Sequence, residues 1–254
     1  HVQGLEVMFM NGETKWLKRG EPLPFPFTPV PQPATTKNSA GYQLTPNADW
    51  IQLLSGSEGT LGIITEVELS LLPIAPSILS GVVFFDSDEH SLDAVDEWRS
   101  IHRLRLLEYI DAASLDFMRA SHPDIPAKAK AALLVEQDLD SEDDPEVDRW
   151  VDRLENHGAL SDESWFGFSA SERERFRVFR HALASSVVET VRRNGMPKIG
   201  TDFAVPIQRN RDLLAYYRKR CEQVFPARYM IFGHIGDANV HLNVFPDSPE
   251  GARI

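Results

Sequence analysis

The sequence predicts an α+β fold in which helices cover one face of a sheet, and three observations support it. Apolar runs of strand length alternate with amphipathic stretches over residues 81–245. Within them, residues 171–194 repeat apolar side chains at spacings of three and four, which is typical of one buried helix face. A Pro/Ala break at 73–76 interrupts the chain before this pattern begins. We therefore predict two domains, 1–77 and 78–254.

The composition excludes several classes of protein. The 254 residues include 38 acidic and 26 basic side chains, a formal net charge of −12. This balance argues against nucleic acid and anionic membrane surfaces as partners, because both attract mainly Lys and Arg. No apolar run approaches the ~18 residues of a membrane span, and no secretory leader opens the chain. With Cys221 as the single cysteine, we expect a cytoplasmic protein.

The first domain is predicted to contain a hairpin, a connection and a strand. Residues 5–19 fold back at Asn11-Gly12, a strong turn signal. Residues 20–33 carry six prolines, so we expect an extended surface segment there. A glycine-rich turn over 56–62 then leads into a strand at 63–69.

The second domain is predicted to alternate between strands and helices before a closing hairpin. An acidic run over 136–148 is interpreted as a solvated loop and helix start, because paired acids need a buried pocket to catalyse. The predicted strands are 81–85, 106–117, 131–137 and 199–205, the helices are 91–104, 145–157, 171–194 and 209–225, and the hairpin is 228–245.

The closing hairpin carries the most informative polar residues. If 240–244 is a strand, Val240, Leu242 and Val244 face the core, while His241 and Asn243 face the opposite side. Across the turn, His234 can lie beside His241. Two imidazoles and an oxygen ligand suit zinc, iron or manganese, although histidines satisfied near a turn would give the same pattern.

Three further features could bind ligands. The glycines of 56–62 let backbone N–H groups approach a phosphate or ring system, but a tight structural turn would look the same. Arg180 lies one residue from the apolar stripe of its helix and could clamp a carboxylate, and Lys198 precedes a strand. Either side chain could equally be solvated.

Three segments together resemble a known family. Residues 37–42 read K-N-S-A-G-Y, residues 56–65 read G-S-E-G-T-L-G-I-I-T, and residues 233–243 read G-H-I-G-D-A-N-V-H-L-N. In this order they resemble motifs of the FAD-linked oxidoreductases of the vanillyl-alcohol oxidase type, in the branch of D-lactate dehydrogenase, the glycolate oxidase flavin subunit and D-2-hydroxyglutarate dehydrogenase. The resemblance implies the second part of a split FAD-binding domain over 1–77, then a mainly antiparallel substrate domain.

The resemblance also implies roles for individual residues. His234 and His241 would bind a divalent metal that holds a small 2-hydroxy acid, while Arg180, Lys198 and Asn243 would handle the substrate. A general base would remove the alcohol proton as hydride passes to FAD, and an electron carrier would reoxidise the flavin. The residues implied to lie against FAD are Lys37, Asn38, Gly41, Tyr42, Gly56, Ser57, Glu58, Gly59, Thr60, Gly62, Ile63 and Ile64.

The sequence departs from the family pattern in four places. It lacks the family's FAD phosphate-binding loop and the later Glu-His segment, which would bring a third metal ligand and a catalytic histidine. A threonine expected at 184 is Ala184, next to Ser185, and the family's lysine falls on Gly200, two residues from Lys198. We therefore expect a fragment that neither retains FAD tightly nor turns over. The alternative is a catalytically silent module that binds a metal or a partner protein.

Overall fold

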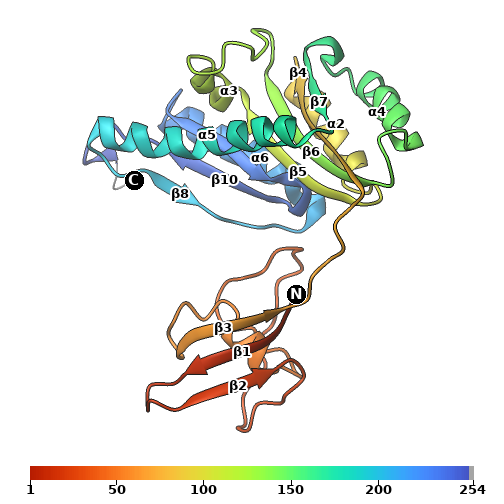
Figure 1. The fold of residues 1–254 in the computed structure, drawn as a ribbon. Helices are drawn as coiled ribbons and strands as arrows, with labels where there is room; N and C mark the ends of the chain where they lie inside the picture. Colours follow the sequence, from red (N-terminus) through yellow and green to blue (C-terminus); the bar gives the residue numbers. More distant parts are fainter. Residues whose placement is uncertain (252–254) are drawn as a thin grey trace. The chain divides into compact units, whose positions relative to one another are not determined.

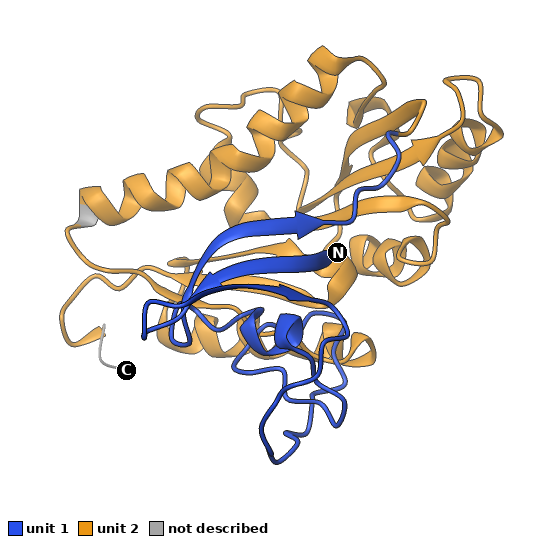
Figure 2. Ribbon diagram, turned by 60° about the horizontal axis from the view of Figure 1, so that its bottom comes forward, with its two compact units in different colours: residues 1–74 blue, residues 75–254 orange. Residues whose placement is uncertain are grey.

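The computed structural model describes residues 1–251, and this part of the chain divides into two compact units, which are described separately below. Unit 1 comprises residues 1–74 and unit 2 begins at Ala75 (Figure 2). The dividing point lies inside the break at 73–76 that the sequence predicts. The assignment of unit 1 to a flavin-binding domain stays a prediction.

Unit 1 contains an antiparallel sheet of order β2-β1-β3. The strands are β1 (Val2–Met8), β2 (Thr14–Lys18) and β3 (Ile63–Leu69). The β1–β2 pair confirms the predicted hairpin. A short helix absent from the sequence prediction, α1 (Trp50–Leu54), begins at a capping box between Asp49 and Gln52. Its Ile51 and Leu54 pack on Leu5, Val7 and Leu17, which forms a small core.

Unit 2 is built on a sheet that, within the described residues, has seven strands in the order β7-β4-β6-β5-β9-β10-β8 (Figure 1). Each pair of neighbouring strands is antiparallel, as predicted. The strands are β4 (Ser77–Phe85), β5 (Leu104–Asp111), β6 (Ala131–Leu139), β7 (Trp165–Gly167), β8 (Ile199–Thr201), β9 (Tyr229–His234) and β10 (Asn239–Val244).

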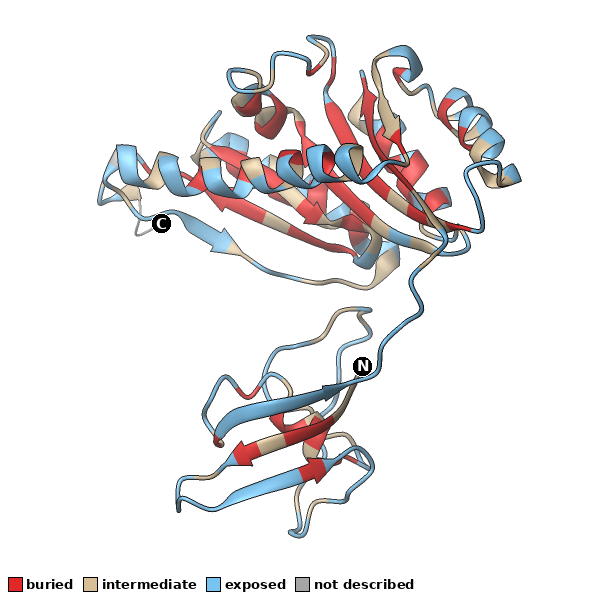
Figure 3. Ribbon diagram, in the orientation of Figure 1, coloured by how far each residue is buried: buried red, intermediate tan, exposed pale blue. Residues whose placement is uncertain are grey.

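Helices cover both faces of this sheet, so the prediction that one face is covered is wrong. The helices are α2 (Asp88–Trp98), α3 (Ala112–Met118), α4 (Pro145–Asn156), α5 (Ala170–Asn194) and α6 (Asn210–Val224). Side chains of α2, α4 and α6 share one core with alternate strand residues such as Tyr109 and Val240. Side chains of α3 and α5 share the other core with Ile110 and Met230 (Figures 1 and 3).

Helix α5 confirms the predicted apolar stripe. Phe176, Phe179, Leu183 and Val187 are each at most 5% exposed and pack on the sheet. The helix begins at a Ser169–Glu172 capping box and ends at Gly195, whose φ of 65° is left-handed. None of the helices that the structure describes is long and apolar enough to cross a membrane.

Several predicted boundaries are wrong. The predicted strand 106–117 ends at Asp111, whose side chain accepts the N–H of Ser114 and so starts helix α3. The predicted helix 91–104 is 88–98, and the predicted strand 199–205 ends at Thr201. The short edge strand β7 was missed.

The acidic run is only partly the solvated loop and helix start that the sequence predicts. Its first residues belong to β6, where Glu136 and Asp138 pair with Arg105. Asp144 caps the start of α4, as expected of an acid at a helix N-terminus.

Candidate functional site

The β9–β10 hairpin separates polar from apolar side chains as the sequence predicts. Val240, Leu242 and Val244 belong to the core shared with α2, α4 and α6, and the alternation places His241 and Asn243 on the opposite face. The register joins Asn239 to His234, which brings the rings of His234 and His241 to 5.3 Å between centroids at an angle of 82°.

Gly233 makes this close ring packing possible. Its φ is +133°, and a Cβ built there would lie 2.6 Å from Cδ2 of His241. A larger residue would push the His241 ring away from its place beside His234. Close packing of the two histidine rings therefore requires glycine at position 233.

Each of the two imidazoles pairs through Nδ1 with a carboxylate. His234 Nδ1 lies 2.9 Å from Glu108 Oε1, and His241 Nδ1 lies 3.1 Å from Asp202 Oδ1. A carboxylate accepts only, so Nδ1 is the donor, and in the neutral imidazole Nε2 carries the lone pair. Metal-binding histidines commonly have this arrangement, so the pair fits half of a metal site. Among residues 1–251, no group of three or more His, Cys, Asp or Glu is arranged to hold a metal ion.

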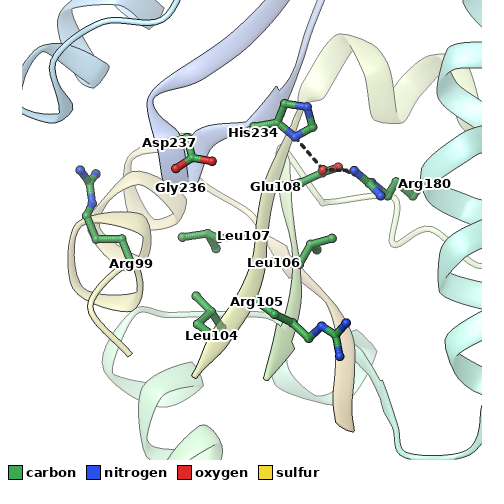
Figure 4. A pocket seen from close by; sticks show the side chains of 10 residues that line it. All are labelled: Arg99, Leu104, Arg105, Leu106, Leu107, Glu108, Arg180, His234, Gly236 and Asp237. Atoms are coloured by element: carbon green, nitrogen blue, oxygen red, sulfur yellow. Dashed lines mark hydrogen bonds and ion pairs between the residues drawn. The ribbon is translucent and has the colours of Figure 1, made fainter. Parts of the chain in front are cut away.

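Glu108 also binds Arg180, which connects β5 to helix α5. Arg180 Nε donates to Glu108 Oε2 at 2.7 Å, and Arg180 Nη2 donates to Glu108 Oε1 (Figure 4). Burial opposes ionisation of Glu108, but the bonds from His234 and Arg180 together hold the pKa of this carboxyl below its usual value. The hydrogen bond to Glu108 in turn raises the pKa of the Arg180 guanidinium. The group is an ionised carboxylate shared by two nitrogen donors.

These three side chains line a cavity of about 320 Å³ at one end of β5 (Figure 4). Its wall combines basic side chains with two carboxylates and three leucines of β5. The other lining residues are Arg99, Leu104, Arg105, Leu106, Leu107, Gly236 and Asp237. A cavity of this size and polarity suits a small charged molecule.

A second cavity has a volume of about 490 Å³, and His241 of the histidine pair is part of its lining. His241, Asn243 and Lys198 line it, together with Gly200, Thr201, Asp202 and Phe232. Lys198 Nζ donates to Asn243 Oδ1 at 2.6 Å. The structure therefore brings together the three residues that the sequence predicts there, although it does not test their roles.

Gly200 leaves room for the Lys198 ammonium. Residue 200 pairs with Asn243 across the β8–β10 ladder, and a Cβ at Gly200 would lie 2.9 Å from Lys198 Nζ. Lys198 lies directly before β8, and its ammonium is on the side where a side chain at Gly200 would project. The lysine reaches the cavity from two residues before the position that the family pattern predicts.

In unit 1, two of the predicted cofactor segments contact each other. The irregular segment containing Lys37, Asn38, Gly41 and Tyr42 lies against the turn that contains Gly56, Ser57, Glu58, Gly59, Thr60 and Gly62. Tyr42 Oη and Thr60 Oγ1 are 2.8 Å apart, and a Cβ on Gly56, whose φ is +83°, would lie 2.9 Å from the carbonyl oxygen of Ser39. Ile63 and Ile64 begin β3 and are exposed.

Sequence reasoning missed two carboxylates of the site, Glu108 and Asp202. Glu108 is one of two acids in the run L-R-L-L-E-Y-I-D, and a charged residue in the middle of a buried strand signals a partner. That partner, Arg180, is 72 residues further along the chain, so no local spacing identifies it.

Comparison with known proteins assigns the family. Residues 75–253 match the family described as "FAD linked oxidases, C-terminal domain". The chain is 28% identical over 250 residues to glycolate oxidase subunit GlcD of Bacillus subtilis, covering 95% of this chain and 46% of that protein. It is 26% identical over 256 residues to D-2-hydroxyglutarate dehydrogenase of Xanthomonas citri, covering 99% and 48%. The chain thus spans about half the length of these two relatives.

A solved structure supports the same fold. Substrate-bound p-cresol methylhydroxylase superposes with a TM-score of 0.57 over 99% of this chain and 53% of that one, at 12% identity. Together with the antiparallel sheet and its covering helices, the matched residues identify unit 2. This chain belongs to the family of FAD linked oxidases, and residues 75–253 form the C-terminal domain that defines it.

Proposed function

We propose that this chain supplies the substrate site, and part of the flavin site, of an FAD-dependent dehydrogenase of small D-2-hydroxy acids. The observation that carries the proposal is the grouping of Arg180, Lys198, His234, His241 and Asn243 around adjoining cavities of unit 2. The relatives named for glycolate and D-2-hydroxyglutarate support the same substrate class. We also propose a cytoplasmic location and an electron-carrier acceptor, as expected from the composition and the resemblance.

The basic side chains would bind the acid. Arg180 would bind the carboxylate of the substrate, because a guanidinium can donate two parallel hydrogen bonds to it. Lys198 and Asn243, already joined by a 2.6 Å hydrogen bond, would supply a second charge and an amide donor to its other oxygens. This division of roles suits a molecule with one carboxylate and one neighbouring hydroxyl.

His234 and His241 would hold a divalent metal through their Nε2 atoms, since each Nδ1 is paired with a carboxylate. A bound metal would lower the pKa of a coordinated substrate hydroxyl. The chain's own contribution is the fixed direction of the two rings, which Glu108, Asp202 and Gly233 maintain.

The residues of unit 1 fit a flavin through their backbone. Gly41, Gly56 and Gly59 have positive φ values and no side chains, so a ligand could approach their peptide groups closely. Bound FAD would accept a hydride from the α-carbon of the acid. The residues of this chain would hold the acid and stabilise its charge.

The test uses a flavin-loaded protein in which these residues are joined to the rest of the flavin site, and a panel of D- and L-2-hydroxy acids under anaerobic conditions. We expect D-acids to bleach the flavin absorbance. Arg180→Lys should raise the KM at least about tenfold, because lysine cannot make two parallel bonds. Arg177→Lys is the matched control, since Arg177 is exposed on the same helix and pairs with Glu174.

Two outcomes would overturn the proposal. One is a flavin that no 2-hydroxy acid reduces. The other is an equal response of the Arg180 and Arg177 variants. Metal binding through His241 without any flavin reduction would instead favour the alternative, a catalytically silent metal- or partner-binding module.

A further inference from the structure

We infer that Glu108 is a positioning residue that sets the directions of both Arg180 and His234. The inference rests on the proposed function, because it concerns how the same site receives a carboxylate. Nothing in the sequence pattern or in the family comparison assigns a role to this residue.

The contacts divide the donors of Arg180 into two groups. A guanidinium has five N–H bonds, and Glu108 engages the one on Nε and one on Nη2. Of the remaining N–H bonds, one on Nη2 and one on Nη1 form the terminal edge of the group, and the third points from Nη1 to its other side. This edge can bind a second carboxylate through two parallel hydrogen bonds. Glu108 thus occupies one edge of the Arg180 guanidinium, and the terminal edge has the geometry to bind a substrate carboxylate.

Burial makes Glu108 a rigid support. It is 9% exposed and lies on β5, which is paired with β6 on one side and β9 on the other. The Arg180 side chain, in contrast, is 35% exposed. A long side chain at such a position loses rotamer entropy when it binds a ligand, unless a partner has already fixed it.

The same carboxylate also fixes His234. Glu108 Oε1 accepts from Arg180 Nη2 and lies 2.9 Å from His234 Nδ1. Since Oε1 only accepts, the imidazole proton is held on Nδ1. A single side chain therefore orients the carboxylate-binding arginine and places the lone pair of His234 on Nε2.

Charge and position predict opposite effects of removing Glu108. Its negative charge partly neutralises Arg180, so on charge alone its loss should tighten the binding of an anionic acid. If Glu108 acts by positioning, its loss should weaken that binding. Glu136 is a matched control, because its charge also acts on Arg180 while its carboxylate pairs with Arg105 at 3.6 Å.

The experiment compares Glu108→Gln and Glu136→Gln in the same flavin-loaded protein, in which these residues are joined to the rest of the flavin site. Anaerobic flavin reduction over a range of D-lactate, glycolate and D-2-hydroxyglutarate concentrations separates the apparent Kd from the limiting rate. We expect Glu108→Gln to raise the Kd of the accepted acid at least tenfold and Glu136→Gln to change it by less than about threefold. Glu108→Asp, which keeps the charge but shortens the reach, should also raise the Kd.

A second measurement needs no substrate. Long-range ¹H–¹⁵N spectra of histidine-labelled protein report which nitrogen of His234 carries the proton. We expect the Nδ1–H tautomer in the wild type and a shift toward Nε2–H in Glu108→Leu. If none of the three acids reduces the flavin of the wild type, the proposed function fails. The tautomer comparison still tests Glu108 in that case.

The inference is overturned if Glu108→Gln binds the acid as tightly as the wild type or more tightly. It is also overturned if the Glu136 variant loses as much affinity as the Glu108 variant, or if the His234 tautomer is the same with and without Glu108. Should Glu108→Gln not fold, Glu108→Asp with an unchanged Kd would refute the positioning role.

Discussion

Asp111 should make unit 2 less stable as the pH rises. This residue ends β5, is 5% exposed and caps helix α3 through the N–H of Ser114 at 2.9 Å. Burial raises the pKa of its carboxyl from 3.8 to about 6, despite the hydrogen bonds from Ser114 and the backbone of Ile231. Between these two values the folded protein holds a proton that the unfolded chain has released.

The sign and size follow from this difference. The contribution of the Asp111 carboxyl to the free energy of unfolding is greatest below about pH 4. It is lost as the pH rises through about 6. A shift of this size corresponds to about 3 kcal/mol at 1.36 kcal/mol for each pKa unit. Asp111→Asn keeps a neutral side chain at every pH, so this part of the pH dependence should disappear.

Urea unfolding followed by tryptophan fluorescence at pH 4 and pH 7.5 measures the effect. From pH 4 to pH 7.5, the difference in unfolding free energy between Asp111→Asn and the wild type should shift by about 3 kcal/mol in favour of the variant. The size of that difference at pH 4 does not affect this expectation. Asp116→Asn, an exposed carboxylate of α3, is the matched control. A stability difference between Asp111→Asn and wild type that stays constant within about 1 kcal/mol would refute the reasoning.

Two further substitutions test the packing of each unit. Phe179→Ala should destabilise unit 2 by about 3–5 kcal/mol in urea unfolding, because the ring is 1% exposed, whereas Val178→Ala, at a half-exposed position, should change stability by about 0.5 kcal/mol. An equal loss from both would show that α5 does not pack as described. Gly56→Ala should lower the thermal stability of unit 1 more than Gly12→Ala: both glycines have φ near +80°, but only the Cβ at 56 would collide with Ser39. Equal melting temperatures would argue against the contact between the two segments.

Much of the fold could be predicted from local patterns. The stripe of α5 and the alternation of β10 are periodic signals, and both were confirmed. The apolar run that continues past Asp111 looks like strand, and only the capping bond to Ser114 shows that helix α3 begins there. A three-residue edge strand such as β7 carries too little sequence to give a period.

The site was predictable only where the residues lie close in sequence. His234, His241 and Asn243 fall within one hairpin, so the period of a strand places them together. Glu108 and Arg180 meet through the packing of α5 on the sheet, and this tertiary contact has no local signature. The predicted roles of all these residues, including metal binding, stay predictions.

Lys198 lies directly before β8, and its ammonium reaches the space beside Gly200. The resemblance places the family's lysine at residue 200, and the Lys198 ammonium lies 2.9 Å from where a Cβ at Gly200 would stand. A long side chain that starts two residues earlier can thus reach the same space, and the glycine leaves that space open. Searches for related sites would therefore gain by comparing where charged atoms end in space rather than which residue number carries them.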